Sequence, residues 1–165
     1  MTEKGALLHA IIENAIDGII TIDQRGLIES INPSACALFG YTIEEVKGRN
    51  ISMLMPQPER SQHDEYIARY QRTGTPHIIG TGRDVKGLKK DGTLFPFRLA
   101  VSEVKYSGMI IYTGFIHDLS REKEAEAQIL HYASQLEKLV EDRTNSLQKS
   151  VIELQMAKET VSKSL

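Results

Sequence analysis

The chain has 165 residues, of which 41% are hydrophobic and 25% charged, and this composition fits one ordinary folded domain with an additional segment. The net charge is −2 and no basic run stands out, so binding to nucleic acid or anionic lipid is not expected. No stretch of about 18 apolar residues occurs, and the amino terminus lacks a basic flank, so neither a membrane span nor a signal peptide is predicted.

Cys36 is the only cysteine in the chain. A single cysteine excludes an internal disulfide, and the absence of CxxC and CxxCH motifs excludes thiolate zinc sites and covalent haem attachment. We therefore interpret Cys36 as a small buried hydrophobe in a reducing cytoplasm. The absence of a membrane span in this segment is compatible with a longer parent protein that is anchored in a membrane elsewhere.

The amino-terminal part of the sequence predicts a helix followed by a hairpin. Apolar residues at helical spacing predict an amphipathic helix within residues 1–15: Leu7, Ala10, Ile11 and Ala15. Residues 18–23 and 27–31 are rich in β-branched side chains and are joined by a Gln-Arg-Gly turn. These two segments are expected to pair as antiparallel strands.

Two short helices are predicted next. An Asn-Pro pair supplies an N-cap and a favourable first helical residue, so residues 33–39 should be helical and should end at Gly40. Thr42 and Glu45 have the spacing of a capping box, which predicts a second helix that stops at Gly48.

Residues 61–83 combine a predicted helix with a predicted strand around a Thr-Gly-Thr-Pro break. The helical part places a histidine on one inward stripe with two tyrosines and an isoleucine: His63, Tyr66, Ile67 and Tyr70. Beyond the break, β-branched residues are interrupted by glycines, which suggests a strand close to something bulky. With Arg69 and Arg83 nearby, this segment would suit a buried anionic cofactor.

A purely structural role for the histidine is the other interpretation. A single histidine on an apolar stripe is usually a core residue whose ring nitrogens bond to a backbone carbonyl or a hydroxyl. Tyr66 or Tyr70 could supply that hydroxyl. On the residues alone, this structural interpretation is favoured.

The sequence after Arg83 predicts three strands in succession. Residues 89–93 form a turn that leads into residues 94–104, where four apolar side chains alternate with other residues and define one face: Phe95, Phe97, Leu99 and Val101. A Ser-Gly turn then leads into residues 109–116, which are strongly β-forming. Two strands, several small helices and three strands predict an α+β fold, a five-stranded antiparallel sheet with helices on one face.

The character of the sequence changes after Asp118. From Arg121 onward there is neither proline nor glycine, and apolar residues recur every seven positions: Ala133, Val140, Leu147, Leu154 and Val161. This pattern predicts a long helix with a coiled-coil seam over residues 119–165. Polar residues near the middle make the seam imperfect. A single helix of roughly 70 Å would not be stable alone, so a parallel homodimer is expected.

Several segments resemble signatures of PAS domains: NAIDGIITID, INPSACALFGYTIEEVKGRNI, KKDGTLFPFRL and GFIHDLS. The resemblance covers about Leu8 to Ser120 and implies a PAS sensor domain over residues 16–118. Within that superfamily the sequence is most similar to the haem-binding domain of FixL-type oxygen-sensor histidine kinases. The segment HDEYIARYQRTGTPHIIGTGRDVKGLKKDGTLFPFRLAV follows that pattern without a gap.

The resemblance implies a role for each matching residue. His63 would bind the iron of a non-covalently held haem b. Arg69 and His77 would meet the haem propionates. Ile78, Leu99 and Val101 would line the dry distal side. Arg83 would move between a propionate and the gas ligand, as the only strong donor in that space.

Two other functions occur among PAS domains. A flavin photosensor of the LOV type needs a cysteine directly after Gly-Arg-Asn, and here Ile51 follows those residues, so adduct photochemistry is not expected. A PAS domain without a cofactor, acting in dimerisation and signal relay, is the alternative. That alternative predicts a pocket closed by side chains, His63 hydrogen-bonded to a neighbour, and Arg83 on the surface.

The long helix has a resemblance of its own. LEKLVEDRTNSLQKS is similar to the signalling helix of bacterial histidine kinases, with Glu141, Arg143 and Thr144 in an E-x-R-T arrangement, and Asp118 would pass the signal into it. His131 is followed by Tyr-Ala-Ser-Gln and does not match the family's phosphoacceptor box. No nucleotide-binding segment or catalytic constellation is found, so this chain is not expected to be an enzyme. The resemblance implies the sensory part of a longer kinase that works with a response regulator.

Overall fold

The computed structural model of the chain describes residues 2–73 and 82–164. The chain divides into two compact units, residues 1–121 and residues 122–165, and each is treated by itself below. The strand expected around Ile78 lies mostly outside the described residues.

The first unit is built on a five-stranded antiparallel sheet in the order β2-β1-β5-β4-β3. The strands are β1 (Gly18–Ile22), β2 (Ile28–Ile31), β3 (Arg83–Leu88), β4 (Leu94–Tyr106) and β5 (Met109–Asp118). This confirms the predicted fold, because the hairpin β1–β2 and the meander β3–β4–β5 meet where β1 pairs with β5. Ile20 lies opposite Gly114, and Gly18 lies opposite Ile116.

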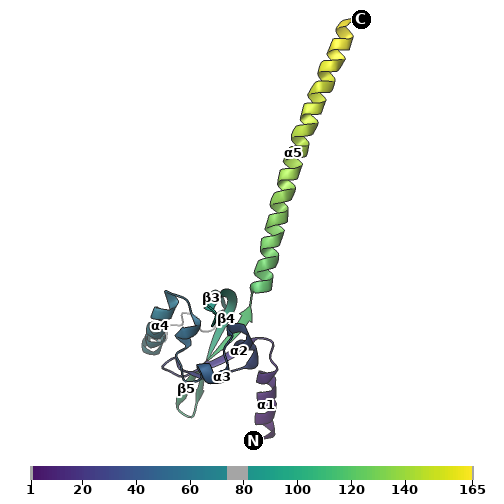
Figure 1. Cartoon of the computed structure of the whole chain (residues 1–165). Helices are drawn as coiled ribbons and strands as arrows, with labels where there is room; N and C mark the ends of the chain where they lie inside the picture. Colours follow the sequence, from purple (N-terminus) through teal and green to yellow (C-terminus); the bar gives the residue numbers. More distant parts are fainter. Residues whose placement is uncertain (1, 74–81, 165) are drawn as a thin grey trace. The chain divides into compact units, whose positions relative to one another are not determined.

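The helical segments lie between the two halves of the sheet in the sequence, and a further helix stands at each end of the chain (Figure 1). They are α1 (Glu3–Glu13), α2 (Pro33–Phe39), α3 (Ile43–Val46), the 3₁₀ helix η1 (Ile51–Leu54), α4 (Glu59–Thr73) and α5 (Ser120–Ser164). Helix α2 begins and ends as predicted, with Gly40 in the left-handed conformation at its end. Helix α3 ends at Val46, earlier than expected, and α4 begins two residues before the predicted stretch.

Asn32 joins α1, β1 and α2 through one buried amide. Its Oδ1 accepts hydrogen bonds from the backbone N–H groups of Ile19 at 2.8 Å and Ala35 at 3.1 Å. Its Nδ2 donates to the carbonyls of Ile12 and Asp17 at 3.1 and 3.0 Å. The residue is 1% exposed, and because all four bonds are made its burial is compatible with a stable core.

Three phenylalanines form the aromatic part of the core. Phe39 of α2 meets Phe95 and Phe97 of β4 edge-on, with ring centroids 5.2 and 6.0 Å apart. Gly87 of β3 lies against all three rings, and a Cβ there would stand 2.7 Å from Cε1 of Phe95. The three rings can pack closely against β3 because Gly87 has no side chain.

The second unit is the remainder of α5, a helix of 45 residues in total. At 1.5 Å per residue it is roughly 67 Å long. Its apolar stripe is exposed along the single chain: Ile129, Leu136, Val140, Leu147, Val151, Leu154 and Val161 are all at least half exposed.

Candidate functional site

A cavity of about 170 Å³ lies between α4 and the inner face of the sheet. One buried water needs only roughly 10–15 Å³ of such space, so this cavity is much larger than a packing defect. The wall formed by α4 consists of His63, Tyr66, Ile67 and Tyr70, together with Glu59. The sheet wall includes Ile20, Ile22, Arg83, Val85, Leu99, Val101, Tyr112, Gly114 and Ile116. The site is therefore an apolar chamber with few polar groups.

The amino-terminal half of α4 is held against η1. The guanidinium of Arg60 donates to the carbonyls of Ser52 and Met53, both at 3.3 Å. One turn further along, the Asn50 amide donates to the Asp64 carboxylate at 3.0 Å. These contacts fix the helical turn that carries His63.

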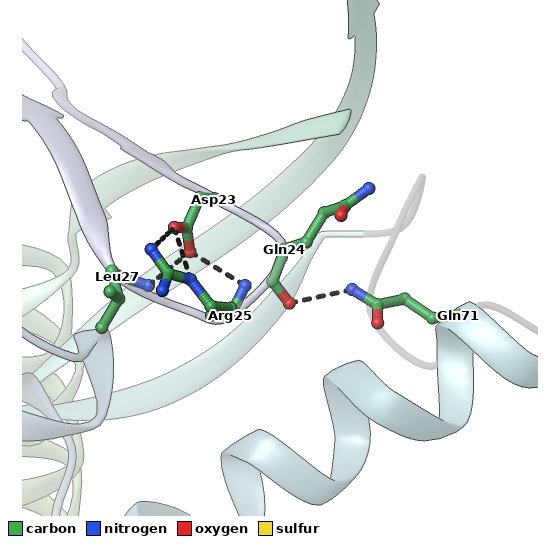
Figure 2. Close-up of polar contacts among 5 residues, drawn as sticks. All are labelled: Asp23, Gln24, Arg25, Leu27 and Gln71. Atoms are coloured by element: carbon green, nitrogen blue, oxygen red, sulfur yellow. Dashed lines mark hydrogen bonds and ion pairs between the residues drawn. The ribbon is translucent and has the colours of Figure 1, made fainter. Parts of the chain in front are cut away.

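The carboxyl-terminal half of α4 is held by the turn between β1 and β2 (Figure 2). Asp23 organises this turn, because its carboxylate accepts the N–H groups of Arg25 at 2.8 Å and Leu27 at 2.9 Å and pairs with the Arg25 guanidinium at 3.2 Å. Burial alone would raise the pKa of Asp23, but these hydrogen bonds outweigh it and the pKa is lowered. Figure 2 shows the Gln71 amide donating to the carbonyl of Gln24, at 2.9 Å. This hydrogen bond connects the carboxyl-terminal half of α4 to the β1–β2 turn.

His63 is the histidine of the cavity wall. It is half-buried, and its Nδ1 is buried without a hydrogen-bond partner among the described residues. Burial lowers the pKa of His63, and the nearby Asp64 carboxylate opposes this only in part. The imidazole is therefore neutral at neutral pH, which is the state that binds a metal ion.

The two tyrosines that could have satisfied His63 have other hydrogen bonds. The Tyr66 hydroxyl donates to Oε1 of Gln62 at 2.6 Å. A hydrogen bond to the Glu103 carboxylate raises the pKa of Tyr70. These contacts do not support the structural role considered for His63, in which a tyrosine hydroxyl would bond to its ring.

The other predicted site residues fall into three groups. Arg83, Leu99 and Val101 line the cavity, and Arg83 and Leu99 are paired across β3 and β4. Arg69 lies on the exposed side of α4 and does not line the cavity. His77 and Ile78 lie outside the described residues. The roles proposed for all of them stay predictions.

The structure adds two polar residues that the sequence analysis did not assign to the site. Tyr112 of β5 lines the sheet wall and is 4% exposed. Glu103 of β4 is its cross-strand neighbour and accepts the bond from Tyr70. The ring of Tyr112 also meets that of Tyr70 edge-on, with centroids 6.0 Å apart. The run Met-Ile-Ile-Tyr at the start of β5 has no alternation, so the sequence gives no signal that places Tyr112 on the inner face.

Over residues 2–73 and 82–164 no cluster of three or more His, Cys, Asp or Glu side chains could hold a metal ion. No helix in the same part of the chain is long and apolar enough to cross a membrane.

Ile51, which stands where a LOV photosensor needs its cysteine, lines the cavity. Burial raises the pKa of the half-buried Cys36 thiol, as expected for an inert cysteine.

The sheet, the helix packed over it and the apolar cavity between them form a small α+β domain. The model of the PAS fold family matches residues 6–119, and the chain belongs to this family.

Two relatives extend the comparison. The sensor protein FixL of Bradyrhizobium diazoefficiens is 41% identical over 129 residues, which are 78% of this chain and 26% of FixL. The oxygen sensor protein DosP of Escherichia coli is 33% identical over 132 residues, 78% of this chain and 16% of DosP. The chain thus spans about a quarter of FixL and less of DosP.

A solved structure supports the fold alone. The PAS domain of a protein from Colwellia psychrerythraea has a TM-score of 0.60 to this chain at 17% identity. The match covers 72% of this chain and 99% of that one.

Proposed function

We propose that residues 16–118 are a sensory PAS domain that binds haem b through His63 and senses oxygen or another diatomic gas. The observation that carries this proposal is a neutral histidine on the wall of an apolar cavity, with a buried ring nitrogen that has no partner among the described residues. The relatives support it, since one of them is an oxygen sensor.

The residues of the cavity fit such a group. Haem, when bound, would supply an iron that takes a diatomic gas on the side away from its histidine ligand. His63 would hold the iron, and the apolar side chains of Leu99 and Val101 would exclude water from the gas side. Arg83 would present a charged donor there. Arg69 and His77 are proposed to meet the propionates, and Ile78 to complete the apolar wall.

A cofactor-free relay module is the competing function. It requires a chamber filled by side chains, a hydrogen-bonded His63 and an Arg83 on the surface. In the described residues the chamber is open, Nδ1 of His63 has no partner, and Arg83 is half-buried on its wall. These three observations favour the haem-binding function.

Strand β5 connects the cavity wall to the start of α5, the helix proposed to transmit the signal. Tyr112, Gly114 and Ile116 line the cavity, and the strand ends at Asp118. The Asp118 carboxylate accepts the Ser120 backbone N–H at 2.9 Å and the Ser120 hydroxyl at 2.7 Å, so the end of β5 is bonded to the first residue of α5. A gas can change the output only by as much as its binding differs between two conformations. We infer that the conformational change caused by gas binding passes from β5 to α5 through the hydrogen bonds between Asp118 and Ser120.

The parent protein is proposed to be a cytoplasmic sensor histidine kinase that acts on a response regulator, with residues 119–165 as its signalling helix. Glu141, Arg143 and Thr144 would belong to the part of the helix that transmits the signal. The kinase activity would reside outside this chain.

The first test of the proposal is a titration of the purified chain with haemin, followed by absorption. We expect saturation at one haemin per chain and a rise in the thermal unfolding midpoint, because a ligand that binds only the folded state stabilises it. A spectrum that stays that of free haemin, with an unchanged midpoint, would leave the relay module as the better function.

Deleting residues 122–165 tests the proposed homodimer. The exposed apolar stripe of α5 is expected to pair with a second copy, and Leu7, Leu8 and Ile11 of α1, all more than half exposed, would add to the contact. Light scattering should report a dimer for the whole chain and a largely monomeric, folded domain for the truncated chain. A dimer of unchanged strength after the deletion would place the main interface within residues 1–121.

A further inference from the structure

Two buried side-chain atoms in residues 2–73 and 82–164 have no hydrogen-bond partner, and both belong to the same cavity. One is Nδ1 of His63 on the helix wall, and the other is the hydroxyl oxygen of Tyr112 on the sheet wall. Unpaired polar atoms are uncommon inside folded proteins because each costs free energy. His63 already has a proposed role as the iron ligand, but no role has been assigned to Tyr112.

Tyr112 differs in this respect from the other tyrosines of the cavity. Tyr66 donates to Gln62, and Tyr70 is bonded to Glu103. The Tyr112 side chain is 4% exposed, so its hydroxyl cannot turn to bulk water. It is the one tyrosine hydroxyl among these three that is left for a ligand.

Tyr112 lies on the cavity wall next to a residue without a side chain. The next inward position on β5 is Gly114, which pairs with Val101 and has no side chain to fill the wall. A Cβ at Gly114 would stand 3.5 Å from Cδ1 of Leu99. Tyr112, Gly114, Leu99 and Val101 line the same cavity, so the Tyr112 side chain shares it with the apolar surface that is proposed to face the gas.

We propose that the Tyr112 hydroxyl donates a hydrogen bond to the diatomic ligand, as a second donor on the sheet wall beside Arg83. This inference rests on the proposed haem-binding function. Oxygen on haem iron accepts a hydrogen bond more strongly than carbon monoxide does, so donors in the ligand space decide which gas is preferred. Tyr112 would be a residue that sets the preference for oxygen.

The test compares Tyr112→Phe with the whole wild-type chain, both loaded with haemin and reduced, in optical titrations with oxygen and carbon monoxide. Loss of one neutral hydrogen bond should weaken oxygen binding roughly 5-fold and carbon monoxide binding less than about 2-fold. Tyr106→Phe is the matched control, because it removes the same hydroxyl from an exposed residue outside the cavity. It should change neither affinity.

Each other outcome has a defined meaning. If the wild-type chain does not bind haemin, the proposed function fails and the inference falls with it. If Tyr112→Phe keeps haem and binds both gases like the wild type, or weakens both equally, the inference alone is wrong. If the variant loses haem, the hydroxyl holds the cofactor and the inference is wrong as stated.

A second measurement separates a ligand contact from a structural one. Because the Tyr112 hydroxyl has no partner among the described residues, removing it should leave the unfolding midpoint of the haem-free chain unchanged or slightly higher. A clear fall of the midpoint would show that the hydroxyl supports the fold, and would contradict the inference.

Discussion

His63→Ala should abolish retention of haem by this chain while the domain stays folded. The substitution removes the only histidine among the described residues that lines the cavity. Loss of an outer-shell partner of a metal ligand costs roughly 10–100-fold in affinity, and loss of the ligand itself should exceed that. Haemin titration followed by gel filtration should show a Soret band travelling with the wild-type protein and none with the variant.

The matched control is His131→Ala, because His131 is an exposed histidine on α5. It should bind haemin like the wild type. A companion variant, His63→Gly, leaves space for free imidazole, and adding imidazole should restore the bound spectrum. Retention of haem by His63→Ala with an unchanged spectrum would show that another residue binds the iron.

Arg83→Ala should keep haem but lose much of the affinity for oxygen. A hydrogen bond from a charged donor contributes about 1.5–3 kcal/mol, which corresponds to a roughly 10- to 100-fold weaker oxygen complex. Carbon monoxide should be affected far less. Dissociation constants for the two gases, measured on the reduced protein, check this prediction.

Arg98→Ala provides the control for Arg83. Arg98 lies on the neighbouring strand with its side chain exposed, and it pairs with Asp84 at 3.0 Å. Its removal deletes a guanidinium of the same strand pair without touching the cavity, and both gas affinities should stay as in the wild type. If Arg83→Ala weakened the two gases equally, the hydrogen-bonding role of Arg83 would be wrong.

Most of the fold could be predicted because local signals agree with the tertiary structure. The Asn-Pro start and the glycine stop define α2, and the alternation of Phe95, Phe97 and Leu99 defines the inner face of β4. The 3₁₀ helix η1 was missed because a single short turn has no apolar period. The need for Gly87 was missed because it arises from three rings that come from two separate elements.

The site was predictable on its helix wall and only partly on its sheet wall. The stripe of α4 has a clear helical period, so its inward residues could be read directly. In β5 the run Met-Ile-Ile-Tyr has no alternation, so the sequence does not reveal which face Tyr112 occupies. Glu103 continues the inner face of β4, where a carboxylate is unexpected. It is accommodated there because Tyr70 bonds to it and Lys105 lies 3.4 Å away.

The most direct test of the central claim is the visible spectrum of the haemin-loaded, reduced chain, recorded under nitrogen, then under oxygen, then under nitrogen again. The proposed function predicts a Soret band that shifts when oxygen is admitted and returns when oxygen is removed, with one oxygen bound per chain. A spectrum that does not respond to oxygen, or one that remains that of free haemin throughout, would contradict a haem-based gas sensor built around His63.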